Sequence, residues 1–205
     1  MNGAESLVRT LVQSDVDICF TNPGTSEMHF VAALDQVTGM RCVLGLFEGV
    51  VTGMADGYGR MADKPASTLL HLGPGFGNGI ANLHNAKKAS TPIVNIVGDH
   101  ATYHVKYNAP LTSNIEGIAT AVSDWVKTSK TALYVAKDGA EAVSQARLGA
   151  GRISTLILPA DAAWGAAGHL VGPLKIEDRS NVSSDIIRKT AAVLKSEGET
   201  LIHIT

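Results

Sequence analysis

The strongest constraint on the fold is an alternation of short apolar runs with longer amphipathic segments along the chain. The apolar runs are nearly continuous, which is typical of strands that are covered on both faces. Repeated strand–helix–strand units of this kind predict an open α/β fold, with a mainly parallel sheet and helices on both faces. The expected strands are 18–21, 41–46, 68–72, 92–97 and 155–158, and the expected helices are 5–14, 26–36, 48–61, 76–89 and 140–148.

Composition excludes several classes of protein. The chain has 17 Lys and Arg against 19 Asp and Glu, whereas a nucleic-acid-binding protein usually has a basic excess. No apolar run approaches the roughly 20 residues that cross a bilayer, and the start lacks the basic and apolar stretches of a signal peptide. Cys19 and Cys42 both lie in apolar runs, so we expect them to be buried thiols of a protein in the reducing cytoplasm.

A change of composition near residue 165 indicates a domain boundary. Small residues at 165–169 and the pair Gly172-Pro173 interrupt the pattern, and a helix with a serine cap over 184–196 and a strand over 201–205 follow. One helix and one strand do not make a domain. We therefore expect a first domain at 1–165, a linker at 166–182 and the truncated start of a central domain at 183–205.

Turn-forming and polar residues follow each of the first four expected strands. In an open α/β fold the ligand site lies beyond the carboxyl ends of the strands. The segments 21–26, 47–49, 71–75 and 98–100 are therefore expected to meet at one edge of the sheet.

Glu48 is the first candidate for chemistry. Arg41 and Glu48 are the two ionisable residues between positions 40 and 55, so this carboxyl lies in an apolar stretch at a strand-to-helix corner. Burial would raise the pKa of Glu48 unless a partner forms a hydrogen bond with it, and such a carboxyl suits proton exchange with a ring nitrogen. The alternative interpretation is a carboxylate stabilised by the dipole at the start of a helix.

Glycines occupy one face of the helix that follows. Gly49, Gly53 and Gly57 are four residues apart, and each glycine in a helix costs about 1 kcal/mol relative to alanine. Close approach of a backbone, a cofactor or a second subunit would compensate for this cost. A tight contact between helix and sheet inside the domain is the alternative.

Common nucleotide and hydrolase motifs do not fit the segment 73–79 or the rest of the chain. The segment lacks the third glycine of the dinucleotide fingerprint, and the chain has neither the Gly-Lys-Ser/Thr of a phosphate loop nor a Gly-x-Ser-x-Gly elbow. Asp99, His100 and His104 have a spacing that metal ligands can have. The tyrosines between and after them favour a surface loop instead, so no metal site is expected in this chain.

Several motifs together resemble the N-terminal, pyrimidine-binding domain of thiamine-diphosphate enzymes, the group of acetolactate synthases and 2-oxo acid decarboxylases of the benzoylformate type. The resemblance covers about residues 1–165. The motifs are Asn22-Pro23-Gly24-Thr25-Ser26-Glu27, Phe47-Glu48-Gly49, Ala55-Asp56-Gly57-Tyr58, 73–79 and Ser90-Thr91-Pro92-Ile93-Val94.

The resemblance implies a role for each matched residue. Glu48 matches the carboxylate that hydrogen-bonds the cofactor's pyrimidine and favours the tautomer that activates the thiazolium carbon. His71 matches a histidine of benzoylformate-type decarboxylases that can donate protons to the substrate. The residues implied to line or shape the cofactor site are Pro23, Gly24, Thr25, Gly73, Pro74, Gly75 and Asn78. The glycine-faced helix would lie where two subunits meet, so a homodimer or homotetramer is expected.

The chain departs from the family pattern at two places. His71-Leu72 stands where synthases usually have Thr-Ser, and Asp99 stands where glutamine is common. Decarboxylation of a 2-oxo acid, with or without carboligation, is therefore implied. Gly98-Asp99-His100 lacks the second glycine of the family's Mg²⁺ motif, and no Asn occurs at 125–129. The Mg²⁺ ligands are therefore expected outside this chain, which alone would be inactive.

Two other functions stay open on the sequence alone. A non-catalytic binding or assembly module could have the same fold without the chemistry. A flavodoxin-like or Rossmann nucleotide-binding protein is the third possibility, and the failed fingerprints weaken it.

Overall fold

A computed structural model describes residues 1–176 and 181–203. Its described part contains one six-stranded sheet, in which every paired strand is parallel to its neighbours. The strand order is β2-β1-β3-β4-β6-β5. The strands are β1 (Ile18–Asn22), β2 (Arg41–Leu44), β3 (Ala66–Leu70), β4 (Ile93–Asp99), β5 (Trp125–Thr128) and β6 (Ile153–Pro159).

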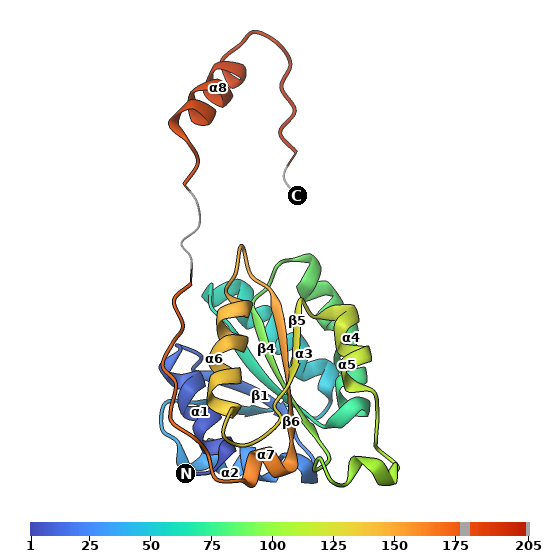
Figure 1. Cartoon of the computed structure of the whole chain (residues 1–205). Coiled ribbons are helices and arrows are strands. Elements are labelled where there is room, and N and C mark those ends of the chain that lie inside the picture. The colour runs from blue at the N-terminus through green and yellow to red at the C-terminus, as the bar shows by residue number, and fades with distance from the viewer. Residues whose placement is uncertain (177–180, 204–205) are drawn as a thin grey trace.

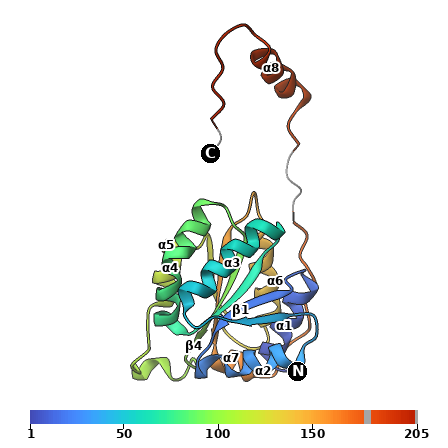
Figure 2. The ribbon, with the colours of Figure 1, turned by 180° about the vertical axis from the view of Figure 1, so that it is seen from behind.

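Helices cover both faces of this sheet, as predicted. Figure 1 shows α1 and α6 on the near face, and Figure 2 shows α3, α4 and α5 on the opposite face. The helices of the first layer are α1 (Gly3–Gln13), α2 (Met28–Gln36), α6 (Val135–Ala146) and α7 (Ala160–Trp164). Those of the second layer are α3 (Glu48–Ala62), α4 (Leu72–Lys88) and α5 (Ile115–Val122).

Each layer has its own hydrophobic core against the sheet. Leu7, Leu11 and Phe30 are fully buried in the first core, and Phe76 and Leu83 are fully buried in the second. The strands between them point alternate side chains into the two cores. This two-sided burial explains why the central strands read as continuous apolar runs.

A chain of buried polar side chains crosses the middle of the sheet. Thr68 donates to Asn95 Oδ1 over 2.8 Å, and Asn95 Nδ2 donates to Thr155 Oγ1 over 3.1 Å. Ser123 and Thr155 share a further hydrogen bond of 2.7 Å. Because these residues bond to one another, they are buried without loss of their polar partners.

The strand at 41–46 differs from the prediction. It ends at Leu44, lies at the edge of the sheet, and leaves Arg41, Cys42 and Leu44 exposed. Cys42 is therefore not the buried thiol that was expected, whereas Cys19 is buried in β1 and burial raises its pKa to about 12. An apolar run alone does not distinguish a central strand from an edge strand.

Three elements were not predicted, the helices α5 and α7 and the edge strand β5. Asn114 caps α5 by accepting a hydrogen bond from the amide of Gly117, which is a sequence signal that was available. β5 is half-buried and contains Lys127, so it lacks the apolar character used to find the others. The remaining short elements are the 3₁₀ turns η1 (Thr25–Glu27) and η2 (Val105–Tyr107).

The chain after α7 contains one further helix in its described part, α8 (Ser184–Leu194). Ser183 caps this helix, in agreement with the predicted serine cap. No residue of α8 is buried, and its apolar side chains include Ile186 and Ile187, each more than half exposed. Residues 201–203 are not a strand, and 204–205 lie outside the described residues, so the last predicted strand is not found in the described part.

Candidate active site

The candidate site lies where the chain changes direction across the sheet. The chain runs from β1 outward to β2 and then returns to the other side of β1 as β3. The carboxyl ends of β1 and β3 flank this switch point, which is where ligands bind in open α/β sheets. η1 (Thr25–Glu27) follows β1, and α4 (Leu72–Lys88) follows β3, so Glu27 at the end of η1 lies close to His71 just before α4.

His71 and Glu27 form a close pair across the switch point. His71 Nδ1 lies 2.7 Å from Glu27 Oε2, which also accepts a hydrogen bond of 2.7 Å from the backbone amide of Gly24. Because an ionised carboxylate only accepts, we assign the proton of this pair to His71 Nδ1. The other ring nitrogen, Nε2, is then available at the site, and the His71 side chain is 23% exposed.

Glu27 is almost completely buried, with 2% of its surface exposed. Burial raises the pKa of this carboxyl, and the bonds from Gly24 and His71 oppose that rise. Its other oxygen, Oε1, has no hydrogen-bond partner in the described part of the chain and lies against Gly98. Glu27 belongs to one of the matched sequence motifs, but the sequence alone predicted no role for it, because the pairing of β1 with β3 is not visible in the sequence.

Glu48 is the first residue of α3 and enters the site from the next loop. Asn78 on α4 donates to Glu48 Oε2 over 3.0 Å. Asn22 Nδ2 donates to the carbonyl of Gly45 over 2.7 Å and thereby ties the end of β1 to the loop that precedes Glu48. The carboxyl is half-buried and hydrogen-bonded to an amide, so its surroundings are less apolar than predicted.

Gly75 brings Glu48 and His71 together. A Cβ on Gly75 would lie 2.9 Å from Glu48 Oε1 and 3.3 Å from His71 Cβ. A residue without a side chain at this position leaves room for the Glu48 carboxyl and for the Cβ of His71. The structure therefore places Glu48 and His71, two residues whose side chains can exchange protons, next to the same glycine.

The segment that contains Gly75 is helical, which corrects the prediction of a loop. α4 begins at Leu72, four residues before the predicted start, so Gly73-Pro74-Gly75 forms its first turn. A proline fits there because the first amides of a helix have no partner inside the helix. Gly73 faces Ser113 of the loop before α5 and not Glu48.

The structure brings together most of the predicted site residues. Gly24, Glu48, His71, Gly75 and Asn78 are linked by the contacts above. A Cβ on Gly24 would lie 2.3 Å from His71 Nδ1, so this glycine is also required by a close approach. Pro23 and Thr25 are the chain neighbours of Gly24; Pro23 is half-buried and Thr25 is exposed. Pro74 is exposed on the first turn of α4.

The glycine face of α3 divides between two environments. The carbonyl of Gly49 accepts a hydrogen bond of 2.6 Å from Asn82, and Gly53 also lies next to Asn82, so both pack on α4. A Cβ on Gly57 would meet open space. The alternative of a tight contact within the domain therefore accounts for the first two glycines, although the contact is with a helix.

Two further motifs of the resemblance serve the fold and not the site. Thr91 donates to Asp56 Oδ1 over 2.7 Å, and Asp56 also pairs with Arg60. Thr91 precedes β4, so this contact lies at the amino end of the sheet. It joins α3 to β4.

Asp99 is the last residue of β4, and His100 and His104 follow it in the next loop. His100 and His104 rings are 5.4 Å apart, and the described residues contain no group of three or more side chains that could hold a metal ion. Asp99 accepts a hydrogen bond of 2.7 Å from the His100 amide, and burial raises the pKa of Asp99.

None of the described helices is long and apolar enough to cross a membrane.

Comparison with known proteins decides the family. A family model described as the N-terminal TPP-binding domain of thiamine pyrophosphate enzymes matches residues 1–122. The chain belongs to this family. The resemblance found in the sequence is thus confirmed, and the matched range contains every residue of the candidate site.

The aligned share of each protein's length differs among the relatives of this family. The putative acetolactate synthase large subunit IlvX of Mycobacterium tuberculosis is 59% identical over 169 residues, which are 82% of this chain and 33% of that protein. The benzoylformate decarboxylase of Pseudomonas aeruginosa is 37% identical over 94 residues, 46% of this chain and 17% of the decarboxylase. The chain therefore spans about a third or less of the length of these relatives.

Solved structures show the same fold. The thiamine diphosphate-dependent 4-hydroxybenzoylformate decarboxylase of Rhodococcus jostii RHA1 superposes with a TM-score of 0.84 at 23% identity. That superposition covers 95% of this chain and 37% of the decarboxylase chain. Nearly the whole of this chain thus has the same fold as the matched part of that decarboxylase.

Proposed function

We propose that this chain supplies the pyrimidine-binding half of a thiamine-diphosphate site that acts on 2-oxo acids. The observation that carries the proposal is the arrangement of Glu48 and His71 around Gly75. A carboxyl and an imidazole in the same site can handle protons on a cofactor ring and on a substrate, respectively.

The residues present fit the pyrimidine part of the cofactor. Glu48 offers a carboxyl that Asn78 orients, and the glycines at 24 and 75 leave room for the side chains of His71 and Glu48. When bound, thiamine diphosphate supplies the electron sink that allows a 2-oxo acid to lose carbon dioxide. Glu48 would hold a ring nitrogen of the pyrimidine and share a proton with it.

His71 would serve the substrate side of the same site. Glu27 holds the ring through Nδ1, so Nε2 is the atom that can pass a proton to or from the substrate. In the net reaction a 2-oxo acid takes up one proton and yields an aldehyde and carbon dioxide. Decarboxylation followed by carboligation uses the same first half, so the site residues support both outcomes.

The other half of the site would come from elsewhere in a larger assembly. Leu46, Phe47 and Val50 surround Glu48 and are 90%, 50% and 52% exposed, so an apolar surface lies beside the carboxyl. Such a surface suits burial against a second copy of the protein. We therefore propose a homo-oligomer, a dimer or tetramer, with the active site between chains.

The diphosphate and Mg²⁺ would bind outside the described residues. Mg²⁺ prefers carboxylate and amide oxygens, and the described part lacks a cluster that could hold it. We also propose that residues 183–203, whose helix α8 exposes its apolar side chains, begin a second domain.

Release of carbon dioxide from 2-oxo acids tests the proposal. The full-length gene product, supplied with thiamine diphosphate and Mg²⁺, should decarboxylate at least one 2-oxo acid from an aliphatic and aromatic set. His71→Phe should slow this reaction by about a hundredfold, the usual contribution of a positioned acid or base. No activity with any member, despite bound cofactor, would favour a non-catalytic binding module.

A further inference from the structure

The segment 165–176 after α7, here called the strap, runs back over the first helical layer. The Gly3 amide donates to the Gly165 carbonyl over 3.0 Å, and the Ala167 amide donates to the Met1 carbonyl over 3.2 Å. A Cβ on Gly168 would lie 2.7 Å from the carbonyl of Leu133. Backbone contacts therefore fix the first part of the strap to the domain.

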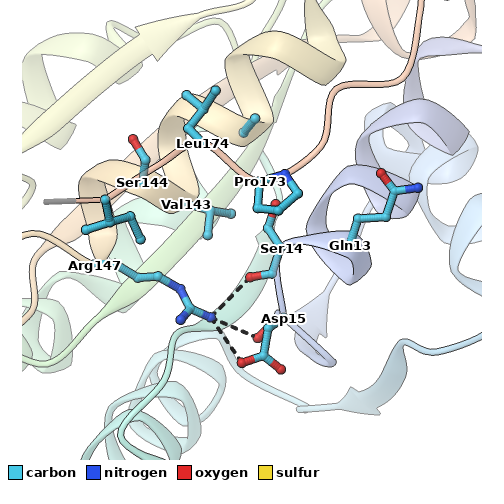
Figure 3. Close-up of a pocket in the computed structure, with 10 residues that line it drawn as sticks. Gln13, Ser14, Asp15, Val143, Ser144, Arg147, Pro173 and Leu174 are labelled. Carbon is cyan, nitrogen blue, oxygen red and sulfur yellow. Dashed lines mark hydrogen bonds and ion pairs between the residues drawn. The ribbon is translucent and has the colours of Figure 1, made fainter. Parts of the chain in front are cut away.

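The second part of the strap closes over a cavity between α1 and α6. Pro173, Leu174 and Ile176 form one wall of this cavity of about 200 Å³. The other walls come from Ser14 and Asp15, which directly follow α1, from Val143 on α6, and from Arg147, which directly follows α6 (Figure 3). No backbone hydrogen bond between the described residues 173–176 and the domain is found, so side chains hold this part.

Two polar atoms lie buried beside this cavity without partners. Within the described residues, Ser14 Oγ and Arg147 Nε have no hydrogen-bond partner, and Ser14 is only 5% exposed. The guanidinium is engaged elsewhere, because Arg147 Nη2 donates to the Ser14 carbonyl over 3.1 Å and to the Asp15 carboxylate over 3.3 Å. Covering a polar group that water would otherwise satisfy costs free energy.

The free energy gained by burying apolar surface when residues 173–176 close over the cavity is small. Leu174 keeps 41% of its surface exposed, so closing the strap removes only part of this side chain from water. The gain and the penalty of the two unpaired groups are of the same order. The closed strap is therefore close in free energy to an open one, in which water reaches Ser14 Oγ and Arg147 Nε.

We propose that residues 173–176 act as a releasable latch. In the closed state the latch fixes where the chain leaves α1 and α6 on its way to α8. In the open state that exit point is free, while the hydrogen bonds of Gly165 and Ala167 still hold the start of the strap. The latch is independent of the thiamine-diphosphate site and adds a conformational device to the domain.

Trypsin cleavage after Lys175 measures how often the latch opens. When opening and closing are faster than cleavage, the cleavage rate follows the population of the open state. Ser14→Ala removes one unpaired group from the closed state and should slow cleavage about fivefold. Leu174→Ala weakens the closed state and should speed it about fivefold.

Leu170→Ala is the matched control, because Leu170 is also 41% exposed but does not line the cavity. It should leave the rate unchanged. Each rate is divided by that of a synthetic peptide of residues 168–181, which removes differences in intrinsic sensitivity to trypsin. The peptide carries the same substitution for Leu170→Ala and Leu174→Ala and is unchanged for Ser14→Ala, because Ser14 lies outside it.

Two results would overturn the latch. One is cleavage of Ser14→Ala at or above the rate of the unchanged chain. The other is cleavage of Leu174→Ala at the rate of Leu170→Ala. Since Leu174 lies on the strap and outside the core, this second comparison stands even where Ser14→Ala fails to fold.

Discussion

Glu27 Oε2 and His71 Nδ1 lie 2.7 Å apart, although the two residues are 44 positions apart in the chain. The parallel pairing of β1 with β3 creates this neighbourhood, because the loop after each strand starts at the same edge of the sheet. A buried carboxylate on one ring nitrogen fixes the orientation of the histidine and leaves the other nitrogen for the substrate.

The buried carboxyl of Glu27 predicts a pH dependence of stability. Burial raises its pKa above the ordinary value of 4.5, so the folded protein holds this proton more tightly than the unfolded chain does. The resulting stabilisation is complete below the ordinary pKa and is lost as the pH rises through the raised one.

Urea unfolding of the unchanged protein and of Glu27→Gln checks this sign. We expect the difference in free energy of unfolding, unchanged minus variant, to decrease from acid to neutral pH. Glu116→Gln, on an exposed residue of α5, is the control for the loss of a carboxyl at the surface. A difference that grows with pH for Glu27→Gln would contradict the assignment of a raised pKa.

Gly75→Ala should damage the site and spare the fold. Its Cβ would reach 2.9 Å from Glu48 Oε1, the mobile end of a side chain, which can shift at little cost. The displaced carboxyl should weaken cofactor affinity about tenfold or more, equivalent to about 1.4 kcal/mol. Titration calorimetry with thiamine diphosphate and Mg²⁺ on the full-length product measures this loss.

Gly77→Ala is the control for that substitution. It lies on the same helix, and its Cβ would meet nothing within 4 Å. The variant should gain up to about 1 kcal/mol of stability from better helix propensity and should bind the cofactor normally. Equal affinities of the two variants would argue against a site around Gly75.

Asn95→Ala tests the polar chain across the sheet. The substitution leaves the buried Thr68 hydroxyl without its partner and removes one of the two hydrogen bonds of the buried Thr155. We expect a loss of about 2–4 kcal/mol in the free energy of unfolding, from unpaired groups and a small cavity. Asn85→Ala, on the exposed side of α4, should change stability by less than about 0.5 kcal/mol.

Leu46→Asp tests the apolar surface beside Glu48. Leu46 is 90% exposed in the chain, so the substitution should leave the fold intact and weaken self-association of the full-length product. Met61→Asp is the control, because Met61 is 88% exposed and lies near the far end of α3. Sedimentation that shows equal association for both variants would place the subunit interface elsewhere.

The sequence predicted the class of fold because the central strands and the main helices carry clear apolar patterns. It did not reveal that β2 is an edge strand, since Arg41–Leu44 is as apolar as a buried strand. It also missed β5, whose half-buried residues include a lysine. In both cases the order of the strands determines burial, and a single sequence does not encode that order as a local pattern.

The candidate site could be predicted only where its residues form a local sequence pattern. Glu48 was found because it is a lone carboxyl in an apolar stretch, and the glycine-rich start of α4 was found by its composition. Glu27 was given no role, because only the folded sheet reveals that it faces His71. The first turn of α4 was expected to be a loop, since glycine and proline disfavour helix interiors but fit a helix start.

The central claim is that the Glu48 carboxyl acts on the cofactor. The most direct measurement is the rate of carbon dioxide release from a 2-oxo acid by the full-length gene product and its Glu48→Gln variant, both saturated with thiamine diphosphate and Mg²⁺. We predict a loss of about a hundredfold or more in the variant, with its free energy of unfolding preserved. A variant that keeps its rate within about twofold, less than 1 kcal/mol of barrier, would contradict the claim.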